Sequence, residues 1–209
     1  MNRLHHQARL IGLTLMLMLL AFGCTATENK TSPELPIPVE YATYSSQNGL
    51  FSISYPPDWL PAQDMLADLE AAAKAYLNSQ TSGLPIEQAS ILFVGGLPPG
   101  YVPSVVVVVE PLPSGISTLE QLVSAQIKGL KMVATGFEEK ARTGTRMGGI
   151  EATLLEYEAS LDGTAVRNVV AILKKGNAAW SVTCSGQPEG FAAYKDDLYN
   201  TARSLRIQG

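Results

Sequence analysis

The stretch GIEATLLEYEASLDGTAVRNVVAILKKGNAAWSVTCS, residues 149–185, decides which fold the sequence predicts. Its apolar residues alternate with a period of two, and Asp162-Gly163 in the middle is a strong signal for a two-residue hairpin loop. Lys175-Gly176-Asn177 provides a second turn, so the stretch predicts a meander of three antiparallel strands. With Asp162-Gly163 as the loop, the ladder places Glu158 opposite Arg167, and this pair of opposite charges supports the register.

Segments on both sides of the meander predict further strands and helices. Leu50 to Tyr55 alternates like a strand, and the two prolines that follow stop it because proline cannot donate a ladder hydrogen bond. Ser117-Thr118-Leu119-Glu120 has the pattern of a capping box at a helix start. The other expected strands are 89–95 and 102–110, and the expected helices are 62–78, 117–136 and 188–204. This order predicts an α+β domain rather than a parallel α/β one.

The N-terminus has the layout of a secretory signal peptide. Arg3 and Arg9 precede an almost unbroken apolar run, Leu10 to Phe22, and no acidic residue accompanies them. The run is shorter than the roughly 20 residues that an α-helix needs to cross a bilayer core. A cleaved signal is therefore favoured over a permanent membrane span.

Ala21-Phe22-Gly23-Cys24 resembles the lipobox of bacterial lipoproteins, although that family usually has leucine and a small residue where this chain has alanine and phenylalanine. The resemblance implies a lipoprotein signal peptide at 1–23 and acyl chains such as palmitate on Cys24. Each buried methylene adds about 0.8 kcal/mol to membrane binding. Two or three chains would hold the protein on the extracytoplasmic face of the cell membrane.

The stretch after the acylated cysteine is expected to separate the membrane from the domain. Residues 24–45 are interpreted as the lipidated N-terminus and a flexible tether, because Thr25 to Glu40 has three prolines and few apolar side chains. Residues 46–209 are expected to form a single domain, since about 165 residues are enough to bury a substantial core.

Removal of the signal would also remove both histidines, His5 and His6. A Ser-His-Asp triad, a Cys-His pair and a histidine-ligated zinc site all need an imidazole, so the mature chain excludes them. The signal holds two of the 15 basic residues and none of the 19 acidic ones, which leaves a mature formal charge of −6 and argues against nucleic acid as a partner. Cys184 has no intramolecular disulfide partner if Cys24 is acylated.

Glu156 and Glu158 are the strongest candidates for a chemical site, because they alternate onto one face of a predicted strand. Paired carboxylates suit general acid/base catalysis or the binding of a hard cation. We interpret them as structural, since Arg167 would neutralise one of them and two carboxylates do not supply the six or more oxygens that calcium prefers.

Other conspicuous residues receive structural interpretations. Trp59 is expected to anchor the core where the first strand ends, and Cys184 is expected to be a small buried hydrophobe. The loop Gly95 to Gly100 has neither the lysine nor the helix of a phosphate-binding loop, so we expect a hairpin loop. Glu138-Glu139 and Asp196-Asp197 are adjacent residues whose side chains diverge, and both pairs are expected to be solvated.

Four stretches resemble the PsbP-like family. GLFSISYPPDW at 49–59 matches the Phe-x-x-x-Tyr-Pro-x-x-Trp pattern that opens the domain of that family. Ser117 to Leu122 is similar to its middle helix, Gly149 to Tyr157 to one of its strands, and Trp180 to Ser185 to its closing strand. The resemblance covers residues 46–207 and implies an antiparallel β-sheet sandwiched between helices, in α/β/α layers.

The PsbP-like resemblance implies binding rather than a reaction. Relatives include the extrinsic P protein of photosystem II, a Ran-binding nuclear import factor and many bacterial lipoproteins, which share docking onto a larger partner. We therefore expect a lipid-anchored, extracytoplasmic, non-enzymatic module that docks on a membrane protein complex or envelope component, with no catalytic residue, cofactor or metal. The alternative is a carrier or receptor for a small apolar ligand, with a pocket beneath the alanine-rich helix 62–78. A hydrolase that uses Glu156 and Glu158 is the third hypothesis.

Overall fold

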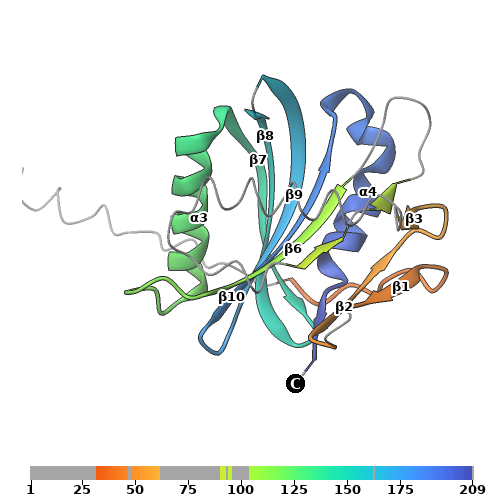
Figure 1. The fold of residues 1–209 in the computed structure, drawn as a ribbon, viewed down its shortest axis with the longest axis horizontal. Coiled ribbons are helices and arrows are strands. Elements are labelled where there is room, and N and C mark those ends of the chain that lie inside the picture. Colours follow the sequence, from red (N-terminus) through yellow and green to blue (C-terminus); the bar gives the residue numbers. More distant parts are fainter. Residues whose placement is uncertain are drawn as a thin grey trace, which may run out of the picture.

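A computed structural model shows how this chain folds (Figure 1). It describes residues 32–46, 49–61, 90–92, 94–95, 104–161 and 163–208. Four of the expectations lie outside these described residues: the signal peptide, Cys24, the helix at 62–78 and the loop that follows Gly95.

An antiparallel sheet of six strands forms the centre of the described structure (Figure 1). Its strands follow the order β4-β6-β10-β9-β8-β7. Their bounds are β4 Ser90–Leu92, β6 Ser104–Pro111, β7 Thr135–Met147, β8 Ile150–Leu161, β9 Thr164–Lys175 and β10 Ala178–Gly186. The predicted meander corresponds to β8, β9 and β10, which are consecutive neighbours in the sheet.

The first loop of the meander lies where the sequence predicts it. Leu161 pairs with Thr164 across the Asp162-Gly163 loop, and Glu158 pairs with Arg167 further along the ladder. Gly163 has a φ of 81°, in the left-handed region that residues with a β-carbon rarely adopt. The loop chemistry therefore sets the register between β8 and β9.

The second loop is shorter than expected. Lys175 pairs with Ala178, so only Gly176 and Asn177 connect β9 to β10. Lys175, which the sequence analysis placed in the turn, closes the ladder instead. A two-residue loop matches the right-handed twist of the flanking strands, which explains why the turn tightens around the glycine.

The structure also contains a strand that the sequence analysis did not predict. β7 precedes β8 and pairs with it, so the meander has four strands rather than three. β7 lies at the edge of the sheet, most of its side chains are exposed, and two irregularities interrupt its register with β8. Because both faces of β7 are largely polar, it lacks the apolar alternation that marks a half-buried strand.

Two smaller sheets accompany the central one. β1 Ala42–Ser45, β2 Phe51–Tyr55 and β11 Arg206–Ile207 form a three-stranded sheet with β2 in the middle. β3 Leu60–Pro61 pairs with β5 Val94–Gly95. β2 confirms the predicted first strand. β1 falls inside the expected tether, which is therefore wrong for these residues, because Ala42 to Ser45 pair along β2.

Helix α3, Leu119–Val133, has its N-cap one residue later than predicted. The N-cap is Thr118, whose hydroxyl accepts the backbone N–H of Gln121 at 3.2 Å. The Gln121 side-chain oxygen accepts the backbone N–H of Ser117 at 2.8 Å and that of Thr118 at 3.2 Å. Gln121 takes the role predicted for Glu120, because its amide oxygen satisfies two N–H groups at the helix start.

The two described helices pack on opposite faces of the central sheet (Figure 1). α3 buries Leu122, Val123 and Ile127 against one face. α4, Phe191–Arg203, follows the short 3₁₀ turn η2, Pro188–Gly190, and packs on the other face together with β2. The α+β class is confirmed. On the second face, the described residues form a mixed layer of helix and small sheet rather than the expected layer of helices alone.

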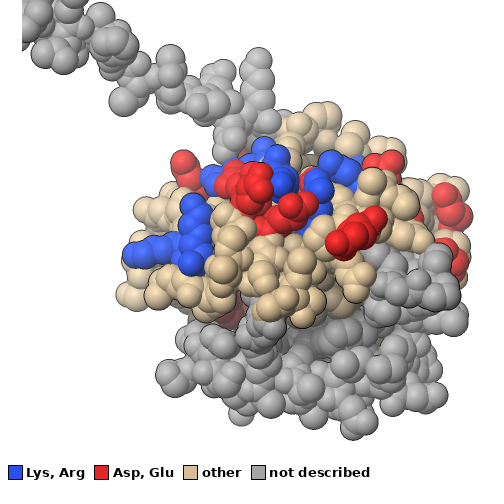
Figure 2. Space-filling view, turned by 90° about the horizontal axis from the view of Figure 1, so that it is seen from above, with Lys and Arg blue, Asp and Glu red and all other residues tan. Residues whose placement is uncertain are grey.

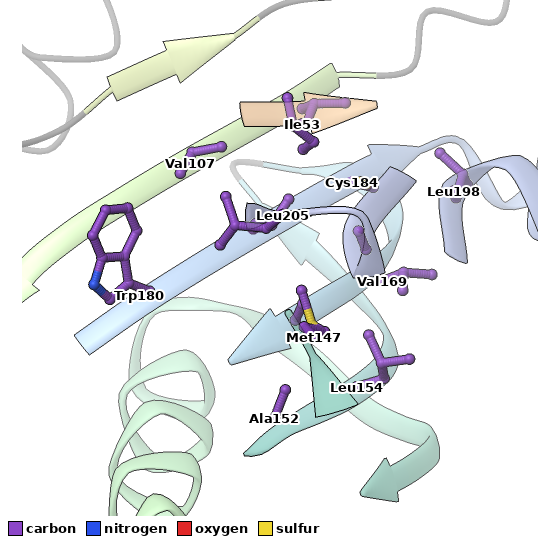
Figure 3. Packing of buried hydrophobic residues seen from close by; sticks show 14 of the residues in the cluster. Ile53, Val107, Met147, Ala152, Leu154, Val169, Trp180, Cys184, Leu198 and Leu205 are labelled. Atoms are coloured by element: carbon purple, nitrogen blue, oxygen red, sulfur yellow. The ribbon is translucent and has the colours of Figure 1, made fainter. Parts of the chain in front are cut away.

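The larger core cluster lies between α4, β2 and the central sheet. Figure 3 shows its side chains converging from these elements, including Ile53, Leu198 and Val169. Trp59 is 1% exposed and belongs to this cluster, so its predicted anchoring role is confirmed. Cys184 is 0% exposed, as expected for a small buried hydrophobe, and it forms no disulfide within the described residues.

Candidate functional site

Two features of the described structure could carry a function. One is a group of charged and polar side chains between α4 and the sheet, which we call the α4 cluster. The other is an apolar cavity beside α3. The α4 cluster consists of Lys140 on β7, Glu156 and Glu158 on β8, Arg167 on β9, and Lys195 and Tyr199 on α4.

Glu156 is the buried centre of the α4 cluster, with a side chain only 1% exposed. Its Oε1 accepts hydrogen bonds from the Arg167 guanidinium, one of them from Nε at 3.0 Å. Its Oε2 accepts from the Tyr199 hydroxyl at 2.6 Å and from Lys195 Nζ at 3.1 Å. Burial favours the neutral acid, but the hydrogen bonds from these three groups outweigh it and hold the pKa of Glu156 below its usual value.

Glu158 occupies the more open side of the α4 cluster. Its carboxylate accepts from Arg167 Nη1 at 2.8 Å and pairs with Lys140 Nζ at 3.0 Å. The Arg167 guanidinium lies 4.3 Å from the centre of the Phe191 ring, a cation–π contact that fixes the arginine between sheet and helix. Arg167 therefore neutralises both carboxylates, where the sequence analysis predicted one.

The α4 cluster is unsuited to the chemistry that paired carboxylates can perform. Both oxygens of Glu156 are occupied by donors, and a hard cation would have to displace Arg167 and Lys195 to reach them. A lowered pKa also keeps Glu156 ionised and unable to act as a general acid near neutral pH. In Figure 2, acidic and basic side chains lie side by side in the middle of the face shown.

The second feature is a cavity of about 340 Å³ between α3 and the sheet. α3 contributes Gln126, Gly129, Leu130 and Val133 to its wall, and the sheet contributes Tyr157, Val170, Ser181 and Thr183. This cavity is a different location from the pocket expected beneath helix 62–78, which lies outside the described residues.

Gly129 keeps the helix side of this cavity open. It lies in the middle of α3, where glycine is unfavourable relative to alanine by about 1 kcal/mol. A β-carbon at Gly129 would meet no heavy atom within 4 Å. The glycine is therefore not required by close packing, and its lack of a side chain leaves space at the cavity.

The C-terminal end of α3 exposes apolar side chains beside the cavity. Met132 is 79% exposed and Val133 is 54% exposed. The apolar stripe of the predicted helix 117–136 includes Val133, and the expectation that this residue is buried is wrong because Val133 lines the cavity between α3 and the sheet. A glycine within a regular helical pattern, followed by Met132 and Val133, was the available signal.

Three of the four adjacent acidic residues that are expected to be solvated form side-chain contacts, and the Glu138 side chain remains 66% exposed. Glu138 pairs with Lys140 at 2.8 Å, and Glu139 accepts two hydrogen bonds from Arg142. Asp197 accepts a hydrogen bond from the Tyr41 hydroxyl at 2.6 Å. The expectation of a solvated Asp197 is therefore wrong, because a distant segment of the chain packs against it.

The described residues include neither a cluster of metal ligands nor a helix suited to crossing a membrane. Within them, no group of three His, Cys, Asp or Glu side chains is arranged to hold a metal ion. None of the helices that the structure describes is both long enough and apolar enough to cross a membrane.

Comparison with known proteins identifies the fold. No protein-family model matches the chain, and no curated protein matches it in sequence. Solved structures do match. They include PA94 of Pseudomonas aeruginosa, a protein of unknown function (13% identity, TM-score 0.51, 81% of this chain and 99% of that chain). CyanoP, the cyanobacterial PsbP of Synechocystis, matches at 12% identity and TM-score 0.50, over 82% of this chain and 94% of that chain. The Ran-binding protein Mog1p of Saccharomyces cerevisiae matches at 10% identity and TM-score 0.50, over 82% of this chain and 96% of that chain.

Proposed function

We propose that this chain, which has the fold shared by PsbP and Mog1 proteins, is a lipid-anchored extracytoplasmic module that binds a protein partner and catalyses no reaction. The sequence supports the anchor through the apolar N-terminal run and the lipobox-like Cys24. The fold supports the binding role, since the matched Mog1p is a Ran-binding protein. The sequence identity between this chain and the solved structures is so low that only the fold is shared. The partner must therefore be inferred from the surface of this chain.

The exposed apolar end of α3 is the observation that carries this proposal. Met132 and Val133 project next to the cavity. Protein interfaces have a desolvated centre in which an aromatic or aliphatic side chain of one partner fills a pocket of the other. The cavity beside Met132 is large enough to receive such an anchor, and the two exposed side chains would surround it.

The rim of this surface is basic. Lys128 and Lys131 are exposed on the same helix, and Lys131 Nζ lies 5.5 Å from the centre of the Phe137 ring. A polar rim around an apolar centre is the usual anatomy of a protein interface. The charges favour a partner with acidic residues at the corresponding positions, because rim charges steer association and fix orientation.

Crosslinking in the native membrane tests the protein-docking proposal. The lipidated protein is crosslinked in its own cells and captured, and its partners are compared among wild type, Met132→Asp and Ala193→Asp. Ala193 is an exposed residue of α4, on the opposite face of the sheet from α3, and serves as the control. We expect one dominant membrane protein with wild type and Ala193→Asp, and its loss with Met132→Asp. Equal capture by all three would rule out docking at α3.

A small apolar ligand is the second candidate, favoured by the cavity itself. Its volume of about 340 Å³ lies at the lower end of the range for ligand pockets, and Leu130, Val133 and Val170 make it largely apolar. Native mass spectrometry of the purified protein would reveal a retained ligand. Gly129→Leu should abolish either kind of binding, whereas Met132→Asp should abolish only protein docking, because Met132 is outside the cavity wall.

A further inference from the structure

The segment Ser32 to Tyr41, which we call the strap, is attached to the domain at four points. Ser32 donates its backbone N–H to the Gly144 carbonyl at 3.0 Å, and Tyr41 donates to Asp197. Between them, Glu34 binds the β7–β8 turn, and the Pro36 carbonyl accepts from Arg203 at 3.1 Å. The strap leads into β1 (Figure 1). The flexible tether expected at 24–45 includes the whole strap, and these contacts show that the expectation is wrong from Ser32 onward.

Glu34 makes the most elaborate of these attachments. Its carboxylate accepts the backbone N–H of Gly148 at 3.0 Å and that of Gly149 at 3.3 Å, and pairs with Arg206 at 2.7 Å. Gly148 and Gly149 form the two-residue loop between β7 and β8, with φ values of 56° and 77°. Successive amides in such a turn form a concave site for an anion.

Polar contacts hold the first part of the strap, and little apolar burial accompanies them. Leu35 is 55% exposed and Val39 is 100% exposed, so these side chains contribute little hydrophobic stabilisation, whereas Ile37 and Pro38 are half-buried. Three prolines within the strap restrict its backbone and reduce the entropy lost when it becomes ordered. Loss of the Glu34 carboxylate should therefore release the N-terminal part of the strap, while its contacts with α4 remain and the core is undisturbed.

The strap changes how far the domain can lie from an acylated Cys24. Eight residue steps separate Cys24 from Ser32, which span at most about 29 Å when fully extended. With the strap detached, the first fixed residue would be Ala42, 18 steps away, and the limit would be about 65 Å. Attachment of the strap therefore reduces the maximum distance between Cys24 and the domain by more than half. It also moves the place where the chain leaves the domain from β1 to the outer edge of β7.

Charge gives this end of the domain no independent attraction to a membrane. Arg206 is paired with Glu34, Arg142 with Glu139 at 2.7 Å, and Arg146 with Glu151 at 3.7 Å. Because each of these arginines has a carboxylate partner, the region presents little net positive charge to anionic headgroups. The attachment of the strap, and not electrostatics, would decide which surface faces the bilayer.

We propose that the outer edge of β7, around Thr143 and Gly144, is the surface of the domain that faces the lipid headgroups of its own membrane, and that the Glu34 contact with the β7–β8 turn keeps it there. This inference rests on the proposed lipid anchor at Cys24. It assigns a membrane-proximal surface to a strand edge that carries no apolar patch of its own.

Fluorescence quenching on vesicles tests the proposal. Lipidated full-length protein carrying a fluorophore at Thr143→Cys or at Thr164→Cys is placed on phosphatidylcholine–phosphatidylglycerol vesicles that contain a headgroup-attached quencher. Cys24 is acylated and Cys184 is buried, so only the introduced cysteine is labelled. We expect stronger quenching at position 143 than at 164, and no effect of added salt on the difference.

Variants of the strap separate the contact from the anchor. Glu34→Ala should reduce the difference between the two labels by at least half, whereas Glu40→Gln, an exposed carboxylate of the same strap, should leave it unchanged. Equal quenching at both positions in the wild type, or an unchanged difference in Glu34→Ala, would overturn the inference while the anchor stands. Failure of the protein to float with the vesicles would instead refute the anchor, and the inference would fall with it.

Discussion

Arg167 forms an ion pair with Glu156, whose carboxylate is buried between α4 and the sheet. Arg167 comes from the strand next to Glu156, and Lys195 and Tyr199 reach the same carboxylate from α4. The Glu156 carboxylate therefore joins the helix to the sheet. A buried ion pair is costly to break on one side only, because the remaining charge stays in a poorly solvated site.

Arg167→Met should lower the free energy of unfolding by about 3 kcal/mol, near the lower end of the range for breaking a buried pair, because Lys195 and Tyr199 still bind Glu156. Urea unfolding measures this loss. The matched control is Arg142→Met, which removes the exposed pair with Glu139 and should cost no more than about 1 kcal/mol. Equal losses in the two variants would contradict a special role for the buried pair.

Stability should fall in acid because of Glu156. Its folded-state pKa lies below the ordinary value of 4.5, so the unfolded chain binds the proton more readily than the folded one. The stabilising contribution is therefore complete above about pH 4.5 and disappears as the pH drops through the folded pKa. Urea unfolding between pH 7 and pH 3 should show a smaller decline for Glu156→Gln than for wild type. Glu151→Gln, an exposed residue of the same strand, should decline like wild type.

Gly129→Ala should stabilise the protein by about 0.5–1 kcal/mol, because alanine is the better helix former and its β-carbon meets no neighbour within 4 Å. Thermal or urea unfolding measures the gain. Gly149→Ala is the opposite case, since a φ of 77° is strained for any residue with a β-carbon, and it should cost about 1–2 kcal/mol. Destabilisation by Gly129→Ala would indicate that the cavity wall cannot accept a methyl group.

The Cys184 thiol should be unreactive in the folded protein. It is fully buried, and burial raises its pKa far above the ordinary range because the thiolate is poorly solvated. A chromogenic disulfide reagent at pH 8 should label Cys184 at least tenfold faster in urea than in native buffer. Equal rates would show that the strand β10 opens readily, and would undermine selective labelling of introduced cysteines.

The sequence by itself determined the elements whose signals are local. The Asp162-Gly163 loop fixes the pairing of β8 with β9, and counting back from this loop is enough to place Glu158 opposite Arg167. Alternating apolar residues identified β2, and a helical stripe identified α3 and α4. These predictions succeeded because turn geometry and residue period act over only a few neighbouring positions.

Tertiary structure alone decided the rest, because the decisive contacts join residues far apart in the chain. Glu34 meets Gly148 across 114 residues, and Tyr199 meets Glu156 across 43, distances over which no local pattern carries information. The edge strand β7 was not predicted because its largely polar faces lack a clear apolar alternation, and the strap resembled a linker because it has three prolines and few apolar residues. The composition of a segment shows how much apolar surface it can bury. Its position in the fold depends instead on the hydrogen-bond donors and acceptors that folding brings close to it.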